Sequence, residues 1–189
     1  MGNLTLANQL TILRIMLIPA FVLLVVYGYL GWALTTFAVA GATDALDGLI
    51  ARRWSGQQTS LGAWLDPMAD KLLLVTTFVV LTLPEIPLTN HIPLWLTVVV
   101  ISRDVVIVGV VAIVNLAVGP RTFRPSIFGK FATATYIVTS VVVMYFNYLG
   151  RPSMLVDVMV WLSLALTLIS SADYFLKMRR IINEPGVAG

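Results

Sequence analysis

Two neighbouring stretches, Asp44-Ala-Leu-Asp-Gly-Leu-Ile-Ala-Arg52 and Gly62-Ala-Trp-Leu-Asp-Pro-Met-Ala-Asp70, decide how this chain of 189 residues is built. Together they hold four of its nine acidic residues. A carboxylate near the centre of a bilayer costs roughly 2.5–3.5 kcal/mol, and close carboxylates repel one another unless cations lie between them. Because the rest of the chain is strongly apolar, the four aspartates predict a divalent-metal site at or just inside a membrane surface.

The composition is that of a membrane protein. Hydrophobic residues make up 59% of the chain and charged residues 11%, with a mean hydropathy of +0.93. A water-soluble domain carries about 25% charged residues. The absence of cysteine and the single histidine, His91, exclude thiolate catalysis, Cys-ligated zinc and His-based triads. We expect an all-α, polytopic membrane protein with one domain over residues 1–189 and no nucleic-acid partner.

Six segments are long and apolar enough to form membrane-spanning helices, each of which needs about 20 such residues. Glycine and proline mark the breaks between them. The predicted helices cover residues 7–29, 31–53, 62–83, 93–118, 127–148 and 153–177. Residues 3–14 could lie along the membrane interface or could extend the first helix, and a short tail is expected from about residue 178.

Basic residues predict the orientation of these helices. They gather at the N-terminal end, in the second and fourth connections and in the C-terminal tail: Arg14, Arg52, Arg53, Arg121, Arg124, Lys130, Lys177, Arg179 and Arg180. The first and third connections carry no Lys or Arg, and the fifth carries only Arg151. We expect a multi-pass protein of a plasma (inner) membrane whose termini and polar active-site cavity face the cytoplasm. The N-terminus has no recognisable signal peptide or Arg-rich presequence, which favours a bacterial membrane.

The spacing of the aspartates predicts that they converge. Asp44 and Asp47 are three residues apart and share a face of one predicted helix, whereas Asp66 and Asp70 are four apart and share a face of the next. The short connection between these helices makes them antiparallel neighbours. Any one of these aspartates alone could be an ion-pair partner, for example of Lys71 or Arg103, but the full set favours a metal site.

Small and basic residues accompany the acidic face. Gly48, Ala51 and Gly62 remove side-chain bulk, so that a planar ligand or a phosphate chain could approach the backbone. Such residues can also be packing contacts between membrane helices. Arg52 and Arg53 add positive charge suited to phosphate.

The pattern D-x-x-D-G-x-x-A-R…G-x-x-x-D-x-x-x-D, which these residues form, resembles the signature of the CDP-alcohol phosphotransferases. The number of helices, the place of the motif on the second and third of them and the chain length are similar too. One departure is visible, because nine residues separate Arg52 from Gly62, one more than in the family pattern. The extra residue is expected to loop out within residues 55–58.

The resemblance implies an enzyme that transfers the lipid-phosphate group of a CDP-linked lipid to an acceptor hydroxyl and releases CMP. It implies that Asp44, Asp47 and Asp66 hold two Mg²⁺ or Mn²⁺ ions, and that Asp70 helps to hold the second ion and acts as the general base. It further implies a homodimer and a cytidine diphosphate site. The residues implied to line that nucleotide site are Gly48, Ala51, Arg52 and Gly62.

Four basic residues outside the motif are candidates for a cytoplasmic acceptor pocket: Arg14, Arg103, Arg124 and Lys130. Arg103 could instead pair with Asp104 or Asp157, and Lys130 could simply mark the cytoplasmic side. The segments around them are similar to those of the branch of the family that acts on CDP-diacylglycerol and makes acidic glycerophospholipids.

Two acceptors stay open within that branch. Glycerol 3-phosphate is the acceptor of phosphatidylglycerophosphate synthases, and its phosphomonoester would suit Arg103 and Lys130. These synthases are the commoner bacterial members of this size, which slightly favours this acceptor. Phosphatidylglycerol is the acceptor of cardiolipin synthases of the CDP-alcohol type. Three features favour phosphatidylglycerol as the acceptor: the nine-residue spacer, the Arg103-Asp104 pair, and the Arg124-Pro125-Ser126 segment that precedes Lys130.

Two other classes of protein use acidic residues in membranes. An intramembrane prenyltransferase would use Asp66-x-x-x-Asp70, but the Asp47-Gly48 and Ala51-Arg52 pairs are not typical of it. A small divalent-cation transporter would show inverted repeats and broken helices. The chain has no internal repeat, and the four aspartates of the motif gather at one membrane face.

Overall fold

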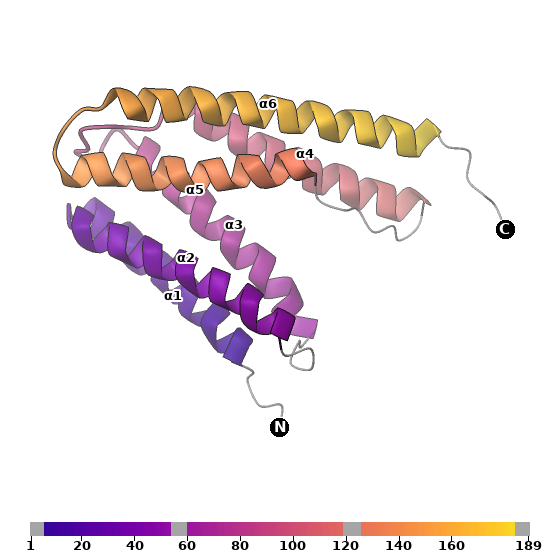
Figure 1. Ribbon diagram of the computed structural model, residues 1–189, viewed down its shortest axis with the longest axis horizontal. Coiled ribbons are helices and arrows are strands. Elements are labelled where there is room, and N and C mark those ends of the chain that lie inside the picture. The colour runs from indigo at the N-terminus through magenta and orange to yellow at the C-terminus, as the bar shows by residue number, and fades with distance from the viewer. Residues whose placement is uncertain (1–5, 54–59, 119–125, 184–189) are drawn as a thin grey trace. The chain divides into compact units, whose positions relative to one another are not determined.

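The computed structural model describes residues 6–53, 60–118 and 126–183, and within the helices it omits the side chains of residues 6–10, 44–53, 60–68, 111–112, 114–115, 117–118 and 179–183 and of Asp70. Over this range the secondary structure is all-helical (Figure 1). The helices are α1 (Leu6–Val26), α2 (Leu30–Arg53), α3 (Ser60–Thr82), α4 (Leu94–Val118), α5 (Ile127–Tyr148) and α6 (Met154–Asn183). The predicted all-α fold and the predicted order of six helices are confirmed.

Two helix bounds differ from the prediction in an informative way. Helix α1 runs without a break from Leu6, so the segment before Arg14 is an extension of the first helix. Helix α6 continues to Asn183, and the tail expected from residue 178 was therefore placed too early. The reason is local, since no helix-breaking residue occurs after Met178 until Pro185.

Glycine ends α1 and α5 in the same way. Gly28 and Gly150 have φ angles of 77° and 62°, a left-handed conformation that costs glycine little. After α1, the Gly28 amide donates to the Val25 carbonyl at 3.0 Å and the next amide, that of Tyr29, donates to the Leu24 carbonyl at 2.8 Å. This pair of bonds is a Schellman motif, which satisfies carbonyls that the helix end leaves open.

The described helices divide into two compact units. The first comprises Met1–His91 with Ser140–Pro152, and the second comprises Ile92–Thr139 with Ser153–Gly189. In the first unit α1 packs against both α2 and α3. The rings of Phe21 on α1 and Phe37 on α2 lie 6.0 Å apart between centroids. Figure 1 shows α1 and α2 side by side.

The second unit contains α4, the first part of α5, and α6. Helix α4 packs against α6, with the rings of Trp95 and Trp161 5.7 Å apart between centroids. Hydroxyl pairs join α5 to α6. The Tyr136 and Thr167 hydroxyl oxygens lie 2.6 Å apart, and the Thr139 and Ser163 hydroxyl oxygens lie 2.8 Å apart.

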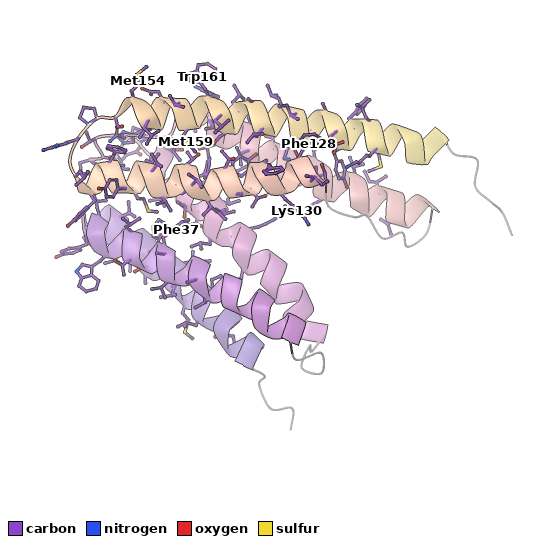
Figure 2. All side chains as sticks on the ribbon, viewed as in Figure 1. Phe37, Phe128, Lys130, Met154, Met159 and Trp161 are labelled. Atoms are coloured by element: carbon purple, nitrogen blue, oxygen red, sulfur yellow. The ribbon has the colours of Figure 1, made fainter. Side chains whose placement is uncertain are left out.

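The surfaces of the helices fit a membrane protein. Among the described residues, two helical segments are long and apolar enough to cross a bilayer, Ile127–Tyr148 and Met154–Met178. In the most apolar stretch of each segment, only 33% and 28% respectively is buried within the protein. Large apolar side chains are exposed along them, such as Trp161, which Figure 2 labels on α6, and Phe175. The six-span topology and the cytoplasmic orientation remain predictions.

Hydroxyl side chains within the helices are satisfied locally. The Thr77 hydroxyl donates to the Leu73 carbonyl at 2.8 Å, and the Thr82 hydroxyl donates to the Phe78 carbonyl at 2.7 Å. Hydroxyl bonding to the preceding turn is a way for a helix to carry polar side chains in lipid, where no water competes for them.

A pair of asparagines fastens the connection before α4 to the end of α5. The buried Asn147 side chain accepts a hydrogen bond from the Asn90 amide at 2.7 Å and donates one to the Asn90 carbonyl at 2.9 Å. The Asn90 side chain in turn donates to the Arg151 carbonyl at 2.9 Å. Both backbone groups of Asn90 therefore bond to one side chain.

Replacing Asn147 with Ala should lower the stability of the protein in detergent. The variant removes the two hydrogen bonds from the Asn147 side chain to the backbone of Asn90, at about 0.5–1.5 kcal/mol for each bond. Thermal unfolding followed by circular dichroism measures the effect. Arg151→Ala is the matched control, because only the backbone of Arg151 takes part in the contact. Equal unfolding midpoints for the two variants would contradict this account.

Candidate active site

The motif positions of α2 fall on the buried side of that helix. This side is marked by buried residues that recur every three to four positions, namely Ala33, Phe37 and Ala40. Continuing the helix at 100° per residue brings positions 44, 47 and 51 into the same sector, and α2 is unbroken from Leu30 to Arg53. The first two aspartate positions therefore lie on the face that packs inward.

The same holds for α3. Ala69, Leu73 and Thr77 are buried, with exposed fractions of 0%, 3% and 0%. Helix α3 is unbroken from Ser60 to Thr82. Positions 66 and 70 therefore lie on the same side of this helix as those three buried residues. All four aspartate positions thus belong to inward sides of α2 and α3, the two helices on which α1 packs.

The side chains of the motif lie outside the described part of the structure. This applies to the four aspartates and to the predicted nucleotide-site residues Gly48, Ala51, Arg52 and Gly62. The spacer within residues 54–59 is likewise outside the described range. Among the side chains that are described, no group of three or more metal-ligating residues occurs elsewhere. The aspartate motif remains the candidate metal site, and its carboxylate donors suit hard divalent cations.

Arg14 lies deep in the first unit. Its side chain is fully buried on the stripe of α1 that includes Thr11, Phe21 and Val25. Phe21 packs against Phe37 of α2. Because α1 and α2 are antiparallel, the position two turns before Phe21 and the position two turns after Phe37 lie at the same height along the helix pair.

That register places the position of Arg14 level with that of Asp44. A buried guanidinium at this level is suited to balance negative charge on the aspartate face. The sequence assigned Arg14 to the acceptor pocket, and that assignment remains a prediction. The register supports a second task for this residue, which is to compensate the charge of the aspartates.

Arg103 forms the centre of a polar cluster in the second unit. Its side chain is 12% exposed, and its Nη1 donates to Asp104 Oδ1 at 2.6 Å, so the ion pair considered from the sequence is present. Its Nη2 donates to the buried Ser170 hydroxyl of α6 at 2.5 Å. A Cβ atom at Gly129 of α5 would lie 3.2 Å from Nη2, so the guanidinium rests against glycine backbone.

The other predicted acceptor residues have different positions. Lys130 follows Gly129 on α5, and its exposed side chain extends from the helix in Figure 2. Arg124 lies outside the described residues. Nearby, Ser126 donates to Asp173 Oδ2, the same oxygen that accepts a bond from Lys177 Nζ at 2.8 Å. This contact ties the start of α5 to α6.

The contribution of α6 was not predicted from the sequence. Ser163, Thr167, Ser170 and Tyr174 follow one another at intervals of four, three and four residues, which places them on one face. This polar stripe in an otherwise apolar helix was a readable signal. Without the structure nothing indicated that Arg103 of α4 would be its partner.

Comparison with known proteins identifies the family. A family model for CDP-alcohol phosphatidyltransferase matches residues 4–169, most of the chain. The chain belongs to the CDP-alcohol phosphatidyltransferase family. This membership confirms the resemblance drawn from the motif, and it favours a transferase over the prenyltransferase and transporter readings.

Individual relatives of this family carry two kinds of name. A cardiolipin synthase (CMP-forming) of Homo sapiens is 40% identical over 132 residues, 69% of this chain and 42% of that protein. A probable phosphatidylglycerophosphate synthase of Mycobacterium tuberculosis is 32% identical over 186 residues, covering 94% of this chain and 83% of that protein. A CDP-diacylglycerol–glycerol-3-phosphate 3-phosphatidyltransferase of Pseudomonas fluorescens is 44% identical over 107 residues, covering 53% and 51%.

Coverage differs among these relatives. The chain spans about half the length, or less, of several of them, including 42% of the human protein and 52% of a cardiolipin synthase of Streptomyces coelicolor. The names divide between cardiolipin synthase and phosphatidylglycerophosphate synthase, the two kinds of enzyme that the sequence also left open.

Replacing Arg14 with Met should destabilise the protein by about 3–5 kcal/mol, the loss typical when one partner of a buried charge pair is removed. Met16→Ala is the control, because Met16 is 65% exposed on the same helix. Thermal unfolding in detergent measures both variants.

The destabilisation by Arg14→Met should be larger in EDTA than in Mg²⁺, since without a cation the aspartates depend on Arg14 for compensation. An effect of equal size in both buffers would separate Arg14 from the aspartate face.

Proposed function

We propose that this protein is a metal-dependent phosphatidyltransferase of phospholipid synthesis. It transfers the phosphatidyl group of CDP-diacylglycerol to glycerol 3-phosphate and releases CMP. The observation that carries the proposal is the aspartate motif, complete in sequence and in register with the inward faces of α2 and α3. Family membership and the names of its relatives support it.

The reaction exchanges a phosphoanhydride bond for a phosphoester bond. The acceptor hydroxyl attacks the lipid-side phosphorus, a new P–O bond forms, and the bond from that phosphorus to the oxygen of CMP breaks. The hydroxyl proton passes to the carboxylate of Asp70, which is the proposed general base. The leaving CMP keeps the bond electrons as a phosphate dianion.

The aspartates have two tasks in this proposal. Asp44, Asp47 and Asp66, helped by Asp70, would hold two Mg²⁺ or Mn²⁺ ions. When bound, these cations supply the positive charge that neutralises the entering and leaving oxygens. The donor set fits such ions, because it consists of carboxylate oxygens alone.

The remaining motif residues would hold the nucleotide. Gly48, Ala51 and Gly62 leave space for cytidine diphosphate, and Arg52 adds a bidentate donor for its phosphates. Arg103 and Lys130 would bind the phosphate of the acceptor. Among the described side chains Lys130 has no ion-pair partner, which leaves its charge available for an anion.

Phosphatidylglycerol is the second candidate acceptor. Relatives named cardiolipin synthase match the chain at 40% identity, and the nine-residue spacer and Arg103-Asp104 favour the same acceptor. Both acceptors carry a phosphate and a free hydroxyl, so the proposed acceptor residues suit either.

Acceptor competition in detergent distinguishes the two candidates. Purified protein receives CDP-diacylglycerol and Mg²⁺ with either glycerol 3-phosphate or phosphatidylglycerol, and CMP release and the lipid product are both measured. We expect CMP release that depends on glycerol 3-phosphate. Release that depends on phosphatidylglycerol alone would establish the second candidate, and release with neither would refute the proposed function.

Asp70→Asn should abolish turnover while the protein stays folded and still binds metal at the first ion position. The amide keeps the size of the side chain but cannot accept the proton from the acceptor hydroxyl. Single-turnover CMP release tests this, with circular dichroism as the check of folding. Normal turnover by the variant would remove Asp70 as the base.

A further inference from the structure

The surroundings of Arg103 contain polar atoms that the fold itself does not use. Arg103 Nε is buried and has no hydrogen-bond partner among the described residues, and the same is true of the Tyr174 hydroxyl on α6. A buried donor without a partner costs about 1–3 kcal/mol. Two such groups from neighbouring helices indicate a place where a ligand completes the bonding.

Ser170 of α6 connects the two groups. Tyr174 lies one turn beyond Ser170 on α6, and Ser170 accepts the hydrogen bond from Arg103 Nη2. Both groups can donate hydrogen bonds, which selects a ligand with acceptor oxygens, such as a phosphate.

The guanidinium is held in one orientation. Asp104 fixes Nη1, Ser170 fixes Nη2, and Gly129 brings the backbone of α5 so close that a Cβ atom would lie 3.2 Å from Nη2 and 3.6 Å from the Ser170 hydroxyl. Fixing both terminal nitrogens directs the remaining Nε–H without further loss of side-chain freedom. Pre-organisation of this kind favours binding because less entropy is lost when the ligand arrives.

The contact between Ser126 and Asp173 strengthens this arrangement. Asp173 is adjacent to Tyr174 in the chain and joins α6 to the start of α5 through Ser126. Asp104 and Asp173 are each paired with a cation, Arg103 and Lys177 respectively. The carboxylates near the site are therefore compensated and do not oppose an incoming anion.

We propose that Tyr174 is a further acceptor-binding residue, which donates its hydroxyl proton to the acceptor phosphate beside Arg103 Nε, and that Ser170 is a positioning residue which holds Arg103 for this contact. The inference rests on the proposed function and names the α6 side of its acceptor site. Glycerol 3-phosphate and phosphatidylglycerol share the phosphate that is recognised.

Four variants test the inference. Tyr174→Phe removes only the hydroxyl, and Ser170→Ala releases Nη2 of Arg103. Tyr145→Phe is the matched control for the first, because Tyr145 is 47% exposed on α5. Ser171→Ala is the matched control for the second, because the Ser171 hydroxyl bonds the Thr167 carbonyl of its own helix at 2.7 Å.

The first readout is direct binding, which needs no turnover. Inorganic phosphate, glycerol 3-phosphate and phosphatidylglycerol in micelles are titrated separately into the protein by calorimetry. Tyr174→Phe and Ser170→Ala should each weaken binding of the preferred phosphate compound by about tenfold or more, as expected for a lost bond to a charged group, whereas the controls should not. Binding unchanged in Tyr174→Phe, or no binding of any of the three by the wild type, overturns the inference.

The second readout is the steady-state rate of CMP release. Tyr174→Phe and Ser170→Ala should raise the KM for the acceptor by about tenfold while the KM for CDP-diacylglycerol stays unchanged. A general structural defect would instead alter both values. If the wild type binds phosphate through Tyr174 but releases no CMP with either acceptor, the proposed function fails and the binding site stands.

Discussion

The placement of charge in an apolar chain is the constraint on which the rest of this protein depends. With 11% charged residues and helices that expose their apolar side chains, each ionised group in the membrane needs a cation, an anion or an inward-facing position. The aspartate positions of α2 and α3 satisfy this by sharing sectors with buried residues such as Phe37 and Leu73. Arg14, fully buried and level with Asp44, follows the same rule from α1.

The helices of the two units pack through different kinds of contact. In the first, small and aromatic contacts bring α1 and α2 together, and Gly31 lets the ring of Tyr148 approach to 2.9 Å of where a Cβ would be. In the second, hydroxyl pairs such as that of Tyr136 and Thr167 join α5 and α6, and the same stripe ends at Ser170 beside Arg103. The structural contacts and the proposed acceptor residues are thus continuous along α6.

Much of the fold followed from the sequence because its signals were local. Runs of apolar residues separated by Gly28, by the prolines from Pro84 to Pro93 and by Gly150 predicted six helices, and the end of α6 was misplaced only because no breaker follows residue 177 until Pro185. The motif identified the family for the same reason. The partner of Arg103 on α6 was not predictable, since it lies 67 residues away and depends on how α4 and α6 pack. The acceptor also stayed open, because both candidates present a phosphate.

The central claim is that the aspartates of α2 and α3 form one divalent-metal site, and Mn²⁺ binding to purified protein tests it most directly. Electron paramagnetic resonance can count bound Mn²⁺ in the wild type and in Asp47→Asn, with Asp157→Asn as the control, because Asp157 lies in the first turn of α6. The account predicts two bound ions in the wild type and the control, and a loss of binding in Asp47→Asn. Equal binding by all three proteins would contradict it.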